Sequence, residues 1–204
     1  MSVIQRYYHF TENQKICLFA SGSSVLNYNI NFEEYDSVIS LNRCYLTPEI
    51  KYVDILFHNS SGKDVMQCCD PKSQKIFREN KMKIVFTPGY DMAPSYHRLV
   101  KTQPDKFSVN RKLLPNAVKF FIKEGVLETG KLLTGVGILW YLTNEYNIKQ
   151  LDLYGFDFFQ NDSDLYYNKN IIDRRKGSDG HNISQNKKVF EWIVNKYPYI
   201  NHYK

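Results

Sequence analysis

The sequence predicts an α/β fold in which helices flank a mainly parallel central sheet. An apolar run at 15–20 is bounded by a Gly/Ser turn at 21–24, which is typical of a buried strand in a parallel sheet. A helical pattern at about 134–146 leads into another apolar run at 150–154, so the two form a βαβ-like unit. The chain has 204 residues, 43% of them hydrophobic, and we expect residues 1–204 to form one domain with its own core.

Further strands are predicted at 36–41, 54–57 and 83–86, because each is a short apolar run. Polar side chains follow the first two of these strands, Asn42 after one and Asn59 after the next. Ligands of open α/β sheets bind at the carboxyl ends of the strands, so either amide could hydrogen-bond a base, a ribose or a sugar. The alternative is that each asparagine caps a turn.

The remaining segments give weaker periodic signals. Residues 87–115 contain four prolines and are predicted to be mostly loop, with one short helix at most. A polar segment without a clear period is expected to form a flexible lid over the site at about 161–180. Asn182 or Ser184 is expected to cap a last amphipathic helix at 185–196. The residues of that helix that should face the core are Val189, Phe190, Trp192 and Ile193.

Charge and composition narrow the classes of partner. The net charge is +6 and the chain has 16 tyrosines, a combination that nucleic-acid-binding proteins also show. The basic residues are dispersed, however, apart from the run at 174–176. A basic surface equally favours anionic donors, or acceptors at an anionic membrane face, through electrostatic steering. We therefore expect no nucleic-acid partner.

The sequence also bears on location. No apolar stretch approaches the roughly 20 residues that a membrane span needs, and the N-terminus has no secretory h-region. We expect a cytoplasmic protein, with the inner face of the membrane as an alternative place of action. The four cysteines lack metal-ligand spacing and are expected to be reduced, half-buried thiols. Trp192 and the tyrosines at 197, 199 and 203 leave a peripheral membrane contact open, and a homo-oligomer is open too.

Three segments carry residues that could do chemistry. The turn at 21–24 exposes N–H groups that attract phosphate, but it fits neither G-x-G-x-x-G nor the P-loop, which argues against NAD and ATP chemistry. Asp162 and Asp164 have the spacing of a metal-binding Asp-x-Asp pair, but they fall in the polar lid, and we expect no metal. His181 precedes a helix in a polar loop and can titrate near neutral pH as a general base does. An exposed loop histidine is the alternative.

Taken together, these segments resemble the sialyltransferases, both the bacterial lipooligosaccharide type and, more faintly, the sialyl motifs of the eukaryotic type. Residues 20–25 and 36–43 are similar to the long motif, which binds the cytidine nucleotide. Residues 133–136 and 153–161 are similar to the short motif, which binds the donor. The resemblance covers nearly all of the chain and is strongest at 133–161.

The resemblance implies that His181 is the catalytic histidine and that Tyr166 and Tyr167 hold the leaving phosphate. It implies a single Rossmann-like domain, a variant of the GT-A fold. The implied reaction is an inverting, metal-independent transfer of sialic acid from CMP-sialic acid to a hydroxyl of a glycan acceptor, such as lipooligosaccharide or capsule, without a cofactor. The implied donor-binding residues are Ser21, Gly22, Ser23, Asn42, Asn59, Thr134, Gly135, Gly155 and Asp157.

The chain departs from the family pattern at some of these positions. Ser21 stands where the family often has asparagine, Phe159 where it has a second tyrosine, and Lys131 where it has an arginine with its bidentate fork. The glutamate that follows the histidine in the eukaryotic type is missing, with Gln185 and Asn186 nearby. Two alternatives stay open for these reasons: a transferase for another CMP-activated sugar such as Kdo, and an inactive nucleotide- or glycan-binding module.

Overall fold

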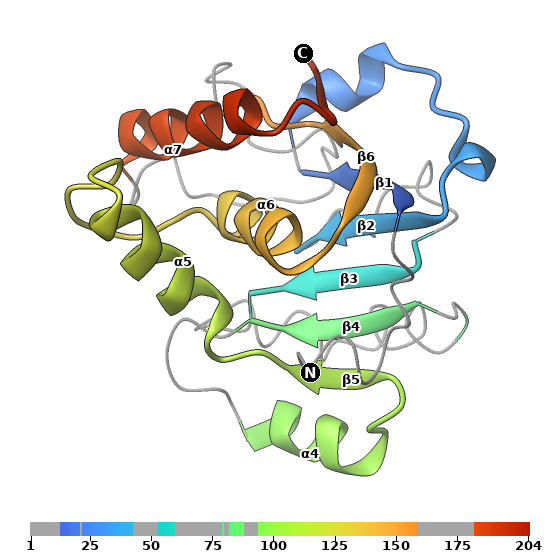
Figure 1. The fold of residues 1–204 in the computed structure, drawn as a ribbon. Coiled ribbons are helices and arrows are strands. Elements are labelled where there is room, and N and C mark those ends of the chain that lie inside the picture. The colour runs from blue at the N-terminus through green and yellow to red at the C-terminus, as the bar shows by residue number, and fades with distance from the viewer. Residues whose placement is uncertain are drawn as a thin grey trace.

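The computed structural model describes residues 13–20, 22–42, 53–59, 79, 82–87, 94–158 and 182–204. Its strands form one sheet in the order β5-β4-β3-β2-β1-β6-β7, and every neighbouring pair runs parallel (Figure 1). This confirms the predicted α/β fold with a parallel sheet. The strands are β1 (Gln14–Phe19), β2 (Ser37–Leu41), β3 (Ile55–His58), β4 (Lys83–Phe86), β5 (Phe107–Val109), β6 (Ile148–Tyr154) and β7 (Ile200–Tyr203).

Helices cover the sheet, and α5, α6 and α7 lie over one of its faces (Figure 1). The helix α4 lies at the β5 edge (Figure 1). A short 3₁₀ helix contributes to the other face, where Phe32 packs on Phe19 of β1 with ring centroids 5.4 Å apart. The helices are η1 (Ser23–Asn27), η2 (Phe32–Glu34), α4 (Pro94–Thr102), α5 (Leu113–Lys123), α6 (Thr134–Glu145) and α7 (Ile183–Lys196). Within the described residues, no helix is long and apolar enough to cross a membrane.

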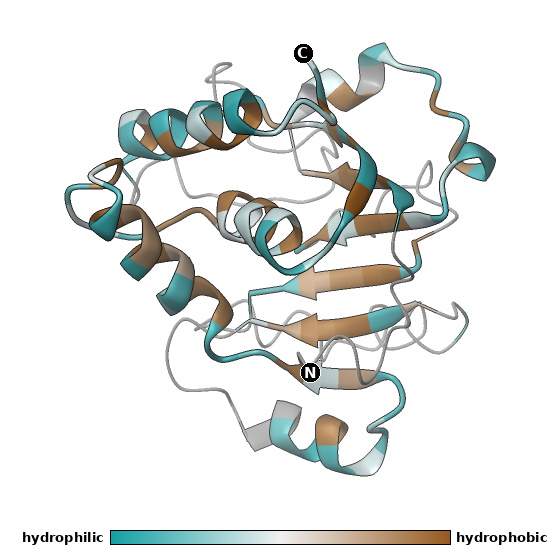
Figure 2. Ribbon diagram, viewed as in Figure 1, coloured by the Kyte–Doolittle hydropathy of each residue, from teal (hydrophilic) through white to brown (hydrophobic). Residues whose placement is uncertain are grey.

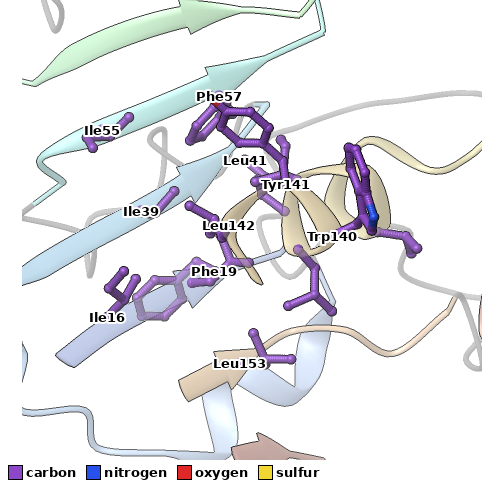
Figure 3. Packing of buried hydrophobic residues seen from close by; sticks show 14 of the residues in the cluster. Ile16, Phe19, Ile39, Leu41, Ile55, Phe57, Trp140, Tyr141, Leu142 and Leu153 are labelled. Carbon is purple, nitrogen blue, oxygen red and sulfur yellow. The ribbon is translucent and has the colours of Figure 1, made fainter. Parts of the chain in front are cut away.

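The central strands are nearly continuous apolar runs because both faces of the sheet are covered. All residues of β2 and β3 are buried, as expected for strands of a parallel sheet with both faces covered. The central strands are accordingly mostly hydrophobic in Figure 2. Side chains of β2 and β3, such as Ile39 and Phe57, meet Tyr141 and Leu142 of α6 in the core (Figure 3). Cys17 is fully buried in β1, so the expectation of a half-buried thiol is wrong for this cysteine.

Most predicted elements are present within two residues of their predicted bounds. The helix predicted at about 134–146 is α6, and the strand predicted at 150–154 is β6. The last helix begins at Ile183, with Asn182 as its N-cap, because the Asn182 side chain accepts a hydrogen bond from the Gln185 N–H at 3.0 Å.

The prediction for 87–115 was wrong in part, because this segment contains α4, β5 and the start of α5. Pro94 opens α4 and Pro115 lies in the first turn of α5. Proline is tolerated in the first turn of a helix, where the missing N–H has no intrahelical partner. The strand β7 was also missed, because its sequence Ile-Asn-His-Tyr has polar residues at its centre and is not an apolar run. Only its first residue is buried.

The order of the strands reverses between β1 and β6. From β1 the sheet continues to β2, β3 and β4 on one side, whereas β6 and β7 lie on the other side. The chain therefore leads from β1 toward one side of the sheet and from β6 toward the other. In open α/β sheets this switch point is where ligands bind.

Candidate functional site

The loops after β1 and β6 are hydrogen-bonded to each other at the switch point. The Ala20 N–H donates to the carbonyl of Tyr154 at 2.8 Å, and the Gly22 N–H donates to the carbonyl of Gly155 at 2.8 Å. The sequence separates these residues by more than 130 positions. The structure thus brings together Gly22 and Gly155, two of the predicted donor-binding residues.

Both positions require glycine. Gly155 has φ +74°, and a Cβ built there would lie 2.5 Å from the carbonyl oxygen of Ala20. A Cβ built on Gly22 would overlap the carboxylate of Asp157. Only a residue without a side chain allows the two loops to approach this closely.

Asp157 fixes the turn that follows β1. Its carboxylate accepts a hydrogen bond from the Ser24 N–H at 2.8 Å and another from the Ser24 hydroxyl. These bonds hold the first turn of η1 against the loop after β6. Hydrogen bonds to a charged acceptor are stronger than neutral ones, so Asp157 positions the Gly/Ser turn rather than leaving it to adopt several conformations.

Asn42 and Asn59 lie next to each other at the carboxyl ends of β2 and β3. The Asn42 Oδ1 accepts a hydrogen bond from the Asn59 N–H at 2.9 Å, and the Asn42 N–H donates to the carbonyl of Phe57 at 2.8 Å. Asn42 has φ +50°, a left-handed conformation that asparagine tolerates better than most residues. Asn42 therefore shapes the turn between the two strand ends, as the turn-capping alternative foresaw.

The start of α6 lies at the same edge of the sheet. A Cβ built on Gly135 would lie 3.0 Å from Leu41 Cδ1 at the end of β2, and 3.2 Å from Phe156 Cε1 after β6. The buried Thr134 is the first residue of this helix. The N-terminus of α6 therefore points toward the switch point, where its N–H groups and dipole favour a negatively charged ligand group.

His202 of β7 contacts the β6 loop from the side of the sheet that α7 covers. Its ring lies close to the backbone of Phe156 and edge-on to Phe190, with ring centroids 4.8 Å apart. Burial lowers the His202 pKa, and the positive charge of Lys204 adds to this shift. The negative charge of Asp157 and the backbone of Phe156 oppose it. Sequence reasoning missed His202, because nothing near it in the sequence marks it as part of the site.

Several predicted residues lie outside the described residues. These are Ser21, the catalytic candidates His181, Tyr166 and Tyr167, the pair Asp162 and Asp164, and the lid at 161–180. The side chain of Ser23 is also not described. The catalytic and donor-binding roles of all candidates stay predictions. What the structure establishes is that Gly22, Asn42, Asn59, Thr134, Gly135, Gly155 and Asp157 gather at the carboxyl edge of the sheet.

Comparison with known proteins gives a match to solved structures only. No family model matches the chain, and no curated protein matches it. CstII from Campylobacter jejuni, a sialyltransferase solved with the substrate analogue CMP-3FNeuAc, has a TM-score of 0.61 and 16% identity, covering 93% of this chain and 81% of that chain. CST-II solved with CMP and a trisaccharide acceptor has a TM-score of 0.60 and 16% identity, with coverages of 93% and 80%.

A mammalian sialyltransferase is also similar, with a TM-score of 0.59 and 13% identity over 97% of this chain and 71% of that chain. The bacterial and the mammalian structures are thus both similar to nearly the whole chain. The resemblance that the two sequence motifs predicted is confirmed at the level of the fold: this chain has the fold of the sialyltransferases.

Proposed function

We propose that this protein is an inverting, metal-independent glycosyltransferase that moves sialic acid from CMP-sialic acid to a hydroxyl of a glycan acceptor. The main support is the pair of glycine loops at the switch point, in a fold shared with sialyltransferases that were solved with CMP. We propose that the reaction takes place in the cytoplasm, with the inner face of the membrane as the alternative place, on acceptors such as lipooligosaccharide or capsule.

We propose that this edge of the sheet binds the donor. The N-terminus of α6 presents backbone N–H groups to the phosphate of the donor, and the Gly/Ser turn held by Asp157 lies at the same edge of the sheet. The amides of Asn42 and Asn59 lie at the ends of β2 and β3, at the same edge, and are proposed to recognise the cytidine or the sugar. The net charge of +6 favours the arrival of an anionic donor.

The proposed chemistry is a single displacement. The acceptor oxygen attacks the anomeric carbon and its proton passes to His181, while the bond from the anomeric carbon to the phosphate oxygen breaks and CMP leaves with the electron pair. General-base catalysis of this kind typically contributes about 10²- to 10⁴-fold. Tyr166 and Tyr167 would donate hydrogen bonds to the leaving phosphate and stabilise its charge.

A second donor is the main alternative. CMP-Kdo offers the same cytidine and phosphate, so the residues that would bind CMP do not distinguish it from CMP-sialic acid. The departures at Ser21, Lys131 and Phe159 favour neither donor. An inactive binding module would have the same edge and bind CMP without turnover.

A panel of donors and a product analysis test the proposal. The purified protein is incubated with CMP-sialic acid, CMP-Kdo or a UDP-sugar, together with a lactose-terminated acceptor, with and without EDTA. We expect transfer from CMP-sialic acid in the presence of EDTA, and NMR of the product should show the inverted anomeric configuration. Transfer from CMP-Kdo alone, a retained configuration or a need for a divalent metal would each contradict the proposal.

A further inference from the structure

We infer that Asn186 is a positioning residue for the transfer reaction, which fixes the start of α7 against the start of α6. The inference rests on the proposed function, because it assigns Asn186 the task of holding the start of α7, which follows the proposed base in the sequence, against the proposed donor-binding helix. Asn186 lies in the first turns of α7, five positions after His181. Asn186 lies near the position at which the eukaryotic sialyltransferases have a glutamate that this chain lacks.

Asn186 is fully buried, and its amide bonds to three backbone groups. The Leu133 N–H donates to its Oδ1 at 2.7 Å. Its Nδ2 donates to the carbonyl of Lys131 at 3.1 Å and to the carbonyl of Asn182 at 2.9 Å. Burying an amide is unfavourable unless it is hydrogen-bonded, and these bonds satisfy both of its N–H groups and its oxygen.

These bonds join two segments that are far apart in the sequence. Leu133 is the N-cap residue of α6, directly before Thr134, and it has no side-chain cap of its own. Asn182 is the N-cap residue of α7 and directly follows His181. A single side chain thus connects the backbone at the entry of the proposed donor-binding helix to the residue beside the proposed base.

A second contact holds α7 against the loop after β6. Phe190, one turn beyond Asn186, stacks on Phe156 with centroids 5.3 Å apart and meets Phe158 edge-on with centroids 5.0 Å apart. Phe156 and Phe158 belong to the loop after β6, which also contains Gly155 and Asp157. The helix α7 is therefore fixed to both segments that are proposed to hold the donor.

This arrangement matters because the base must reach the acceptor hydroxyl. A general base acts within hydrogen-bond distance of the proton that it removes, and a displacement of about 1 Å can cost about 10²-fold in rate. Asn186 does not itself act on the substrate in this account. It acts through the position of Asn182, the residue that follows His181 in the sequence, relative to the start of α6.

The test uses Asn186→Asp, which has the same shape as the wild-type side chain. The aspartate keeps an acceptor for the Leu133 N–H but places an oxygen against the carbonyls of Lys131 and Asn182. We expect kcat per folded molecule to fall about 10- to 100-fold, while the KM for the donor and the Kd for CMP stay near the wild-type values, because the α6 entry keeps its bond.

Val189→Ala is the matched control. Val189 is fully buried in the same helix, so its truncation destabilises α7 packing without touching the bonds of Asn186. Its kcat per folded molecule should equal that of the wild type. If Asn186→Asp behaves like Val189→Ala, with wild-type kcat per folded molecule, the residue is merely structural and the inference is overturned.

Hydrogen exchange at the Leu133 amide distinguishes failure of the inference from failure of the proposed function. We expect slow exchange in the wild type, fast exchange in Asn186→Ala and slow exchange in Val189→Ala. If the wild type turns over no CMP-sugar, the proposed function fails, and the positioning role in catalysis fails with it, whatever the exchange shows. If the wild type turns over but exchange at Leu133 is unchanged in Asn186→Ala, only the inference is overturned.

Discussion

Gly155 is one of the residues at which the two loops of the site approach closely. Comparing it with Gly125, which has a similar φ, separates the cost of the left-handed backbone from the cost of the close approach. Gly155 and Gly125 have φ of +74° and +70°, but a Cβ on Gly125 would meet nothing within 4 Å. Gly125→Ala should cost about 1–2 kcal/mol from the left-handed backbone alone. Gly155→Ala adds the overlap with Ala20, so we expect a larger loss of unfolding free energy in denaturant titrations.

The same pair of variants tests the site. Gly155→Ala should also abolish binding of CMP in calorimetry, because the Gly22 turn must move when the loop after β6 moves. Gly125→Ala should bind CMP with wild-type affinity. Equal CMP affinity in the two variants would show that the loops at the switch point do not hold the nucleotide.

Two substitutions remove different numbers of the hydrogen bonds between Asp157 and Ser24, and so predict effects of different size. Asp157→Ala removes both hydrogen bonds to Ser24, whereas Ser24→Ala removes only the one from the hydroxyl and keeps the one from the N–H. A bond to a charged group contributes about 1.5–3 kcal/mol. We therefore expect CMP affinity to fall about 10- to 100-fold in Asp157→Ala, and less in Ser24→Ala. A smaller effect of Asp157→Ala than of Ser24→Ala would refute this role.

The residues that could be predicted from the sequence are those next to strand ends. Gly22, Asn42 and Gly155 follow apolar runs directly, and the carboxyl ends of parallel strands meet at one edge. Asn186 and His202 could not be assigned to the site in this way. Asn186 acts through backbone groups more than 50 positions away, and His202 lies on a short edge strand, so only the packed structure brings them to the site.

At the scale of elements, a buried carboxylate ties β6 to its surroundings on the face opposite α6. Asp152 accepts hydrogen bonds from the Tyr35 hydroxyl at 2.7 Å, from the Asn201 amide at 2.7 Å, and from the Gln150 amide at 3.0 and 2.9 Å. Burial raises the pKa of Tyr35, and its hydrogen bonds to Tyr154 and Asp152 add to the shift, so its hydroxyl keeps its proton and stays a donor.

Asp152→Asn should be destabilising, although it is isosteric, because the new amide turns its own N–H groups toward donors. Leaving a buried group unsatisfied costs about 1–3 kcal/mol. We expect this loss of unfolding free energy in urea titrations, and a smaller loss for Tyr35→Phe, which removes a single donor. An Asp152→Asn protein as stable as the wild type would show that these hydrogen bonds do not hold β6 in place.

Elements with strong periodicity were predicted well, and those with mixed sequences were not. The strand β1 and the helix α6 have long apolar patterns bounded by glycine or polar residues. The strands β5 and β7 are as short as β3 and β4, but they mix polar and apolar residues, whereas β3 and β4 are apolar runs. Proline marks a loop in most contexts, which concealed α4 and α5.

At the scale of the whole molecule, the parallel sheet could be predicted, but the order of its strands could not. Consecutive strands tend to be neighbours, which is true of β1 to β5. β6 lies beside β1 because the chain returns from β5 over one face of the sheet through α5 and α6 (Figure 1). That placement creates the switch point, so the location of the site is a property of the topology.

The pH dependence of global stability should show the contribution of His202. Its pKa in the folded state lies below the unfolded value of about 6.5, because burial and Lys204 disfavour the charged form. The unfolded chain therefore binds more protons, and stability rises with pH up to about 6.5. Above about pH 6.5 neutral His202 does not lower the stability of the folded state. As the pH falls below this value, protonation of His202 in the unfolded chain reduces the stability of the folded state.

Urea titrations of the wild type and His202→Gln across pH 5 to 8 measure this contribution. The stability of the wild type relative to the variant should decrease below pH 6.5. A constant difference across the range would mean that His202 is not buried against the loop after β6.

Release of CMP from CMP-sialic acid, measured in the presence of EDTA for the wild type and His181→Ala, tests the central claim most directly. We predict that the wild type releases CMP faster when a glycan acceptor is added. We also predict that turnover in His181→Ala falls about 10²- to 10⁴-fold while CMP still binds. CMP binding without turnover in the wild type, or unchanged turnover in His181→Ala, would contradict the account.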